Sequence, residues 1–254
     1  MVEISNLKVY DLEECIRSCR NAMRLTPSDY SSEDFEKSLE RAKKLCKAPS
    51  NSGHANFLTG IRVSFDIKYP NYISSEMQRY HWFDFVTSSS KMHTLIKMAG
   101  YPTYYNKYVT QESLDQMKRL QDRYNTACET GTQEDQYEAF MMLVSNCPQG
   151  IELFMRVSTN YMQLRTIYAQ RRHHKLKEDW GALCDMIEKL PYAKEFLLVD
   201  QELENSEEKK LCECGGELKW EGATMTSYPP QYPYTCTKCG KRYVYRTDGT
   251  RWEW

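Results

Sequence analysis

The chain has 254 residues, ten of them cysteine, and a formal net charge of −1 at pH 7. The near-neutral charge provides no global basic field, which argues against a protein that acts mainly by binding nucleic acid. No apolar run is long enough to span a bilayer, and the first residues, with Glu3 and Asp11, lack a signal-peptide pattern. We therefore expect a soluble, cytoplasmic protein with one large domain and a small appendage.

The first part of the chain alternates between strand and helix patterns. Alternating apolar residues indicate strands, whereas apolar residues at helical spacing indicate amphipathic helices. Asp11, followed by Glu14, resembles a capping box that opens a helix. We predict a strand over residues 1–10, a helix from Asp11 to Met23, a helix over about Ser32–Cys46 and a strand over Phe57–Ile67.

The stretch Gln78–His93 combines Arg79, His81, four aromatic residues and a serine cluster within sixteen residues. Arginine offers a planar fork of donors that suits phosphate, and serine hydroxyls can approach an anion closely. We expect a helix with its exit loop here, and a site for a phosphate-bearing small ligand. The alternative is an amphipathic helix whose polar side chains only cap and solvate it.

The rest of the large domain has a mainly helical pattern. We expect residues 1–200 to form this domain. The highly charged segment Gln201–Lys210 has few apolar residues and is predicted to be a linker. The predicted helices cover about Glu112–Thr130, Glu134–Val144, a long segment from Glu152 through Arg172, and about Lys177–Leu190.

Four of the ten cysteines lie near the C-terminus in two glycine-flanked knuckles, which predicts a zinc ribbon over residues 211–254. Four thiolates on two tight turns suit a tetrahedral zinc ion, although the first knuckle has one intervening residue where two are usual. Two disulfides are the alternative, and the expected cytoplasmic location argues against them. The predicted ligands are Cys212, Cys214, Cys236 and Cys239.

Three segments of the large domain resemble the flavin-dependent thymidylate synthases. The first runs from Gly53-His54 to Phe65-Asp66-Ile67 and keeps the family's spacing, but the family's Glu-His pair falls on Thr59 and Gly60. The second lies over the family's Arg-His-Arg signature and its later serine and arginine. The aligned residues of this signature are Arg79, Tyr80, His81, Ser89 or Ser90, and Lys91.

The third segment follows Pro148. The family has an Asn-x-Arg-Ser-Leu motif twelve residues after a proline, and then an arginine seven residues beyond that leucine. Asn160, Leu164 and Arg171 stand in this register, whereas Met162 and Gln163 replace the family's Arg-Ser. Agreement in spacing over three segments is stronger than any single motif.

The resemblance implies an α+β fold in which a twisted, largely antiparallel sheet packs with helices, and a homotetramer with active sites at its interfaces. It implies reductive one-carbon transfer to C5 of dUMP or a related pyrimidine nucleotide. The implied cofactor is FAD, with NADPH and methylenetetrahydrofolate as co-substrates. Carried over by position, Arg79, Ser89, Ser90, Lys91 and Arg171 would bind the nucleotide, with Arg171 also catalytic. His54, His81 and Asn160 would lie near the flavin.

Two other functions remain open at this point. The protein could be a catalytically divergent nucleotide-binding or assembly protein that makes contacts through the zinc ribbon. It could also be a nucleic-acid-binding protein that uses the ribbon, whose Lys241 and Arg242 lie among aromatic residues. The net charge weighs against the latter.

Overall fold

A computed structural model describes residues 2–26, 35–48, 53–198, 210–221, 231–246 and 251–253. The chain divides into two compact units, Met1–Asp200 and Gln201–Trp254, which are described separately. The predicted linker lies, except for Lys210, outside the described residues. Within the part of the chain that the structure describes, no helix is both long and apolar enough to cross a membrane.

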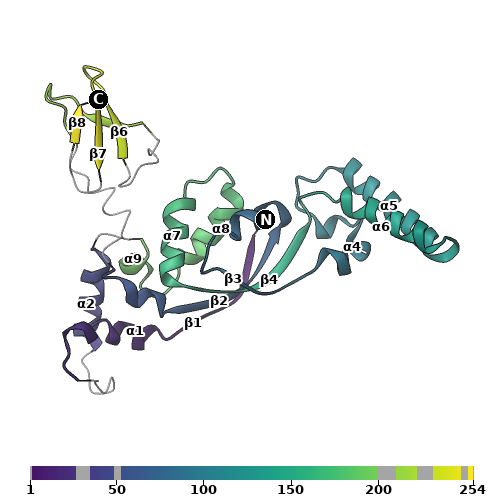
Figure 1. Ribbon diagram of the computed structural model, residues 1–254, viewed down its shortest axis with the longest axis horizontal. Helices are drawn as coiled ribbons and strands as arrows, with labels where there is room; N and C mark the ends of the chain where they lie inside the picture. The colour runs from purple at the N-terminus through teal and green to yellow at the C-terminus, as the bar shows by residue number, and fades with distance from the viewer. Residues whose placement is uncertain are drawn as a thin grey trace. The chain divides into compact units, whose positions relative to one another are not determined.

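A four-stranded antiparallel sheet organises the first unit (Figure 1). Its order is β1-β2-β4-β3, so that β4 lies between two strands that precede it in the chain. The α+β fold with a largely antiparallel sheet is confirmed. The strands are β1 (Glu3–Tyr10), β2 (Arg62–Pro70), β3 (Asp84–Ser88) and β4 (Glu152–Asn160).

The prediction of one long helix from Glu152 through Arg172 was wrong in its first half. Glu152–Asn160 forms β4, and the helix α7 (Tyr161–Arg171) begins only afterwards. In β4, Leu153, Met155 and Val157 are buried while the residues between them face outward. This two-residue period fits a strand with one buried face, and pairing with β2 along its whole length fixes the extended conformation.

The helix predicted within Gln78–His93 was also wrong. The short helix α3 (Ser74–Met77) ends before this stretch, a turn follows, and β3 then pairs with β4. The helix α4 (Lys91–Met98) begins only near the end of the stretch. Phe85, Val86 and Thr87 favour a strand because aromatic and β-branched side chains fit a pleated surface.

The predicted N-terminal helix is shorter than expected. The helix α1 (Leu12–Ser18) is followed by a separate 3₁₀ turn, η1 (Asn21–Met23). Asp11 adopts a left-handed conformation with φ of 59° and makes no side-chain cap, so the predicted capping box does not form. The helix α2 (Phe35–Cys46) agrees with the prediction, whose first residues lie outside the described ranges.

The other predicted helices are confirmed. The helices α5 (Gln111–Thr130) and α6 (Gln133–Ser145) form an antiparallel hairpin (Figure 1). Thr132 caps α6 in a capping box with Asp135. The remaining elements are α8 (Lys177–Glu188), α9 (Ala193–Phe196), and the 3₁₀ turns η4 (Asn56–Thr59), η5 (Asn71–Ile73) and η6 (Pro102–Tyr104).

One face of the sheet carries the main hydrophobic core. Val63, Phe65 and Ile67 of β2 are buried against residues of α7, α8 and α9, while Asp66 and Lys68 point to the other side. A smaller core joins α4, α5 and α6. The main core therefore fixes the positions of the end of β4 and the start of α7, which the candidate site uses.

The second unit is a four-stranded antiparallel sheet with strand order β5-β6-β7-β8. Among the described residues of this unit, the buried cluster has five members, and two of them are cysteines. The strands are β5 (Leu218–Trp220), β6 (Gln231–Cys236), β7 (Arg242–Arg246) and β8 (Arg251–Glu253).

Candidate nucleotide site and cysteine cluster

The turn between α3 and β3 is held against the end of β4 and the start of α7. The backbone N–H of Trp82 donates to Oε1 of Gln163 at 3.2 Å, and its carbonyl accepts from Oγ1 of Thr159 at 2.6 Å. Gln163 and Thr159 are buried, whereas Arg79 and His81 of the turn are exposed. The structure thus fixes the backbone of the turn and leaves two of its predicted site residues open to solvent.

Asn160 ends β4 and caps α7. Its Oδ1 accepts from the backbone N–H of Gln163 at 2.9 Å, which satisfies one of the free amides of the first turn. Asn160 and the Arg79–His81 turn therefore adjoin the same short segment of chain. His54 is exposed and lies two residues before η4, which packs against α7.

Arg171 lies at the other end of α7 and is engaged by neighbouring side chains. Its Nη1 donates to Oε2 of Glu76 at 3.0 Å, and its Nε donates to the Tyr80 hydroxyl at 2.6 Å. Its guanidinium also lies 4.6 Å from the centre of the Trp180 ring. The side chain is 14% exposed, so Arg171 is a largely buried member of a network within the chain.

Glu76 and Tyr80 complete this network. Oε2 of Glu76 also accepts from Nε1 of Trp180 at 3.0 Å and lies 3.6 Å from Nε2 of His174. The Tyr80 hydroxyl donates to Oε1 of Gln170 at 3.1 Å, and burial raises the pKa of Tyr80. Tyr80 is therefore protonated at neutral pH and orients the Arg171 guanidinium.

The predicted residues Ser89, Ser90 and Lys91 follow the C-terminal end of β3, whereas the Arg79–His81 turn precedes its N-terminal end. The Oγ of Ser89 accepts from the backbone N–H of Phe154 at 3.1 Å, and Ser90 occupies the N-cap position of α4 without a side-chain cap bond. Asp84 and Ser89 are five residue steps apart along extended chain, a distance of roughly 17 Å. One chain therefore places its predicted substrate-binding residues in two groups.

An open pocket of about 590 Å³ lies on the outer face of the sheet, beside Ser89. Its cations already have carboxylate partners: Arg156 is 3.0 Å from Asp66, and Lys68 is 2.7 Å from Glu152. Lys91 and the Arg79 turn do not line it. Ser89 is thus the only predicted substrate-binding residue in this pocket.

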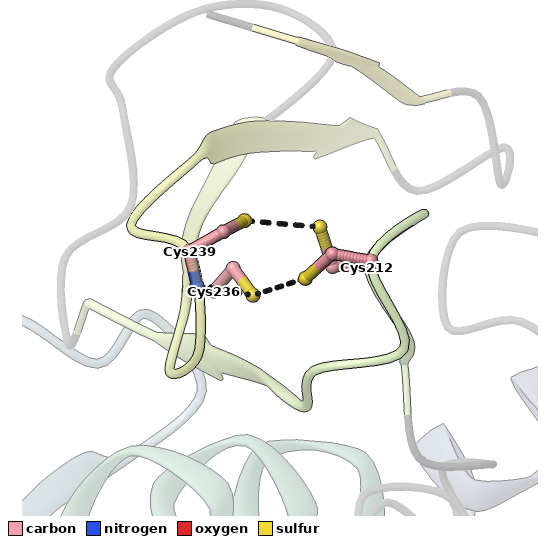
Figure 2. A group of neighbouring side chains, drawn as sticks. Cys212, Cys236 and Cys239 are labelled. Carbon is pink, nitrogen blue, oxygen red and sulfur yellow. Dashed lines mark hydrogen bonds between the residues drawn. The ribbon is translucent and has the colours of Figure 1, made fainter.

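The four C-terminal cysteines converge on one point. Their sulfur atoms all lie within 4.8 Å of one another, and the pairs Cys212–Cys239 and Cys214–Cys236 are each 3.5 Å apart (Figure 2). Zn–S bonds of about 2.3 Å in a tetrahedron would place sulfur atoms roughly 3.8 Å apart. The ligand set and the sulfur separations of the cluster are therefore compatible with a metal site.

Backbone groups around the cluster favour thiolates. The amides of Cys239 and Lys238 donate to Sγ of Cys236 and lower the pKa of this thiol to about 6. A Cβ added at Gly216 would lie 2.7 Å from the same sulfur. Only glycine leaves room there for the sulfur to sit close to the backbone.

The sequence prediction missed three residues that shape the site: Glu76, Trp82 and Gln163. In the sequence, Gln163 is recognisable only as a replacement of the serine in the family motif. The one visible signal was Trp82 itself, a large aromatic residue beside a cationic motif. Glu76 gave no such signal, because carboxylates near a helix end are common.

Comparison with known protein structures identifies the fold of this chain. No model of a known family and no curated protein matches the sequence. Thymidylate synthase ThyX from Helicobacter pylori, solved with FAD and dUMP, superposes with a TM-score of 0.58 at 15% identity. The match covers 79% of this chain and 98% of that one. The chain has the ThyX fold. A second H. pylori ThyX structure, complexed with FAD and dUMP, gives a TM-score of 0.55 at 15% identity, over 76% of this chain and 97% of that one.

A second protein, seen in the third structure, shares the ThyX fold with this chain. The UMP/dUMP methylase PolB from Streptomyces cacaoi, bound with 5-Br dUMP, has a TM-score of 0.51 at 11% identity. The match covers 79% of this chain and 95% of that one. The fold is therefore shared by proteins described as acting on dUMP and on UMP.

The residues around Trp82 fit a flavin in chemical type. Trp82 and His81 offer exposed planar rings, and Arg79 offers an exposed cation for a phosphate. By contrast, the position of the family's histidine is Gly60, where an added Cβ would lie 2.6 Å from Sγ of Cys15. The Cys15 side chain fills the space that a larger residue 60 would need.

Proposed function

We propose that the first unit binds a pyrimidine nucleoside monophosphate, dUMP or UMP, together with FAD, and transfers a one-carbon unit to C5 of the pyrimidine. NADPH and methylenetetrahydrofolate are the proposed co-substrates. When bound, reduced FAD would supply the electrons for the transferred carbon. The observation that carries the proposal is the ThyX fold over nearly the full length of its dUMP-binding neighbours. Hydrogen bonds that join Gln163 to Trp82, which follows the Arg79–His81 signature, and to Asn160 support it.

Each group of residues has a role suited to its chemistry. Arg79 would bind phosphate through its guanidinium, and the hydroxyls of Ser89 and Ser90 with Lys91 would add donors. A cation near the pyrimidine also stabilises negative charge that develops on the ring. Within one chain, Arg79 lies far from Ser89, Ser90 and Lys91. We therefore propose that a second copy of the chain completes each site, as in a homotetramer.

For the second unit we propose one structural zinc ion held by Cys212, Cys214, Cys236 and Cys239. Direct binding of nucleic acid through this unit has less support. Arg242 is 2.5 Å from Glu221, and Lys241 is 3.0 Å from Glu253, so both cations are paired. We therefore regard the second unit as a stabilising or assembly module.

The test uses the full-length protein and separates binding from turnover. We expect the purified protein to bind FAD, with a flavin absorbance that dUMP perturbs, and to release tritium from dUMP labelled at C5 when the co-substrates are present. Arg79→Ala should weaken dUMP binding by about 10- to 150-fold, because charge-assisted hydrogen bonds contribute about 1.5–3 kcal/mol. Arg119→Ala, at an exposed position of α5, is the matched control.

A colourless protein that neither takes up FAD nor binds dUMP or UMP would contradict the proposal. Binding of nucleotide without tritium release would instead identify a catalytically divergent nucleotide-binding protein. Replacing dUMP with UMP in the same assay decides between the two nucleotides.

A further inference from the structure

Trp82 is a large aromatic residue that the fold holds at the surface. Trp82 is 57% exposed, although its backbone N–H and carbonyl both form hydrogen bonds with buried side chains. Thr159 is 2% exposed and Gln163 8% exposed, so these partners cannot move freely. A ring presented from an immobilised backbone loses little conformational entropy when it binds a ligand.

The contacts of Trp82 link two departures from the family pattern. Gln163, which stands where the family has serine, holds the backbone of Trp82 directly after the altered signature Arg79-Tyr80-His81. The His81 ring lies 4.6 Å from the Trp82 ring in an edge-to-face arrangement. This edge contact orients the indole and leaves ring surface open for stacking.

We infer that the Trp82 indole stacks on the isoalloxazine ring of the bound flavin. This inference rests on the proposed function. Indole is an electron-rich aromatic system and isoalloxazine is a large electron-poor one, so their faces attract and exclude water. The indole has two fused rings, and it covers more of a three-ring flavin than of a single pyrimidine ring.

The experiment compares wild type, Trp82→Ala, Trp82→Phe and Trp220→Ala, the last being an exposed tryptophan of the second unit. Each full-length protein is titrated with FAD, and separately with ADP and with dUMP, while flavin absorbance and tryptophan emission are recorded. Aromatic stacking is worth about 1–3 kcal/mol by alanine substitution, so Trp82→Ala should weaken FAD binding about 5- to 150-fold. Trp82→Phe should recover part of this loss, and Trp220→Ala should bind as wild type.

Two further readouts distinguish stacking from a structural role. ADP, which lacks the isoalloxazine ring, should bind equally to wild type and Trp82→Ala. The thermal unfolding temperature should also be unchanged, because the contacts that hold the turn use the backbone of residue 82. In wild type, FAD should quench tryptophan emission, and Trp82→Phe should lose most of that quenching.

The inference is overturned if wild type binds FAD and Trp82→Ala binds it equally well, or if the substitution weakens only dUMP binding. In both cases the proposed function survives. If wild type binds neither FAD nor dUMP, the proposed function and the inference fall together.

Discussion

At the scale of single residues, several departures from the family pattern are joined by direct contacts. Tyr80 orients Arg171, and Gln163 holds Trp82. Cys15 fills the space beside Gly60. The sequence shows each of these only as a lost motif residue. Because the partners are distant in the chain, only the folded structure identifies the contacts.

Arg171 provides the first test at this scale. We expect Arg171→Ala to lower the free energy of unfolding by about 2 kcal/mol, because it removes a largely buried ion pair and leaves the Glu76 carboxylate without its cation. Glu76→Gln should destabilise the protein less, since an amide can still accept from Trp180. Urea unfolding measures both, with exposed Arg119→Ala as the control for loss of an arginine.

The opposite result would assign Arg171 to the ligand. If Arg171→Ala unfolds at the wild-type urea concentration but binds dUMP at least tenfold more weakly, the guanidinium serves the nucleotide and its network is secondary. The motif position in the sequence predicts this ligand role. The contacts with Glu76, Tyr80 and Trp180 favour the structural one.

At the scale of elements, the sequence predicts helices better than strands embedded among helix-forming residues. The strand β1 and the helices α5, α6 and α8 follow from clear periodicity. The strand β4 was missed because Glu152, Leu153 and Met155 are also good helix formers and the segment runs directly into α7. Pairing with β2 and β3 decides its conformation, and that information lies elsewhere in the chain.

The same limit applies to the candidate site. The predicted helix ends correctly near Arg171, but it places Asn160 in the middle of a helix, whereas Asn160 ends β4 and caps the start of α7. The sequence does not show that Arg79 and Ser89 lie beyond opposite ends of a strand, because it predicts a helix where β3 forms.

The junction between α1 and η4 offers a test at the element scale. Gly60 has an ordinary backbone conformation, with φ of −81°, so a substitution there is opposed only by contact with Cys15. We expect Gly60→Ala to destabilise the protein by about 1–3 kcal/mol through overpacking. Gly181→Ala in α8, where an added Cβ meets nothing within 4 Å, should instead stabilise it by up to about 1 kcal/mol.

A double-mutant cycle identifies the cause. Cys15→Ala removes the sulfur and leaves a Cβ about 4.0 Å from the added methyl group, so it should relieve most of the Gly60→Ala penalty. Chemical denaturation of the four proteins gives the coupling energy. Simple additivity of the two substitutions would show that steric contact with Cys15 is not what requires glycine at position 60.

At the scale of the whole molecule, the two units have very different means of stabilisation. The first unit has a core built from its sheet and helices. The described part of the second unit buries five residues in one cluster, of which Cys212 and Cys236 are also proposed zinc ligands. So small a core rarely stabilises a fold alone, and metal binding then supplies much of the folding free energy.

This difference predicts two separate unfolding transitions. The purified protein should contain about one zinc per chain, and a chelator should abolish the transition of the second unit while that of the first remains. Cys239→Ala should lose the metal and this transition together, because three thiolates leave the tetrahedral set incomplete. Cys128→Ala, which removes an exposed cysteine of α5, should retain both. Calorimetry with elemental analysis provides the measurement.

If Cys239→Ala keeps a full complement of zinc, or if wild type contains none, the four sulfur atoms do not form the metal site and the second unit must fold by its side-chain packing alone.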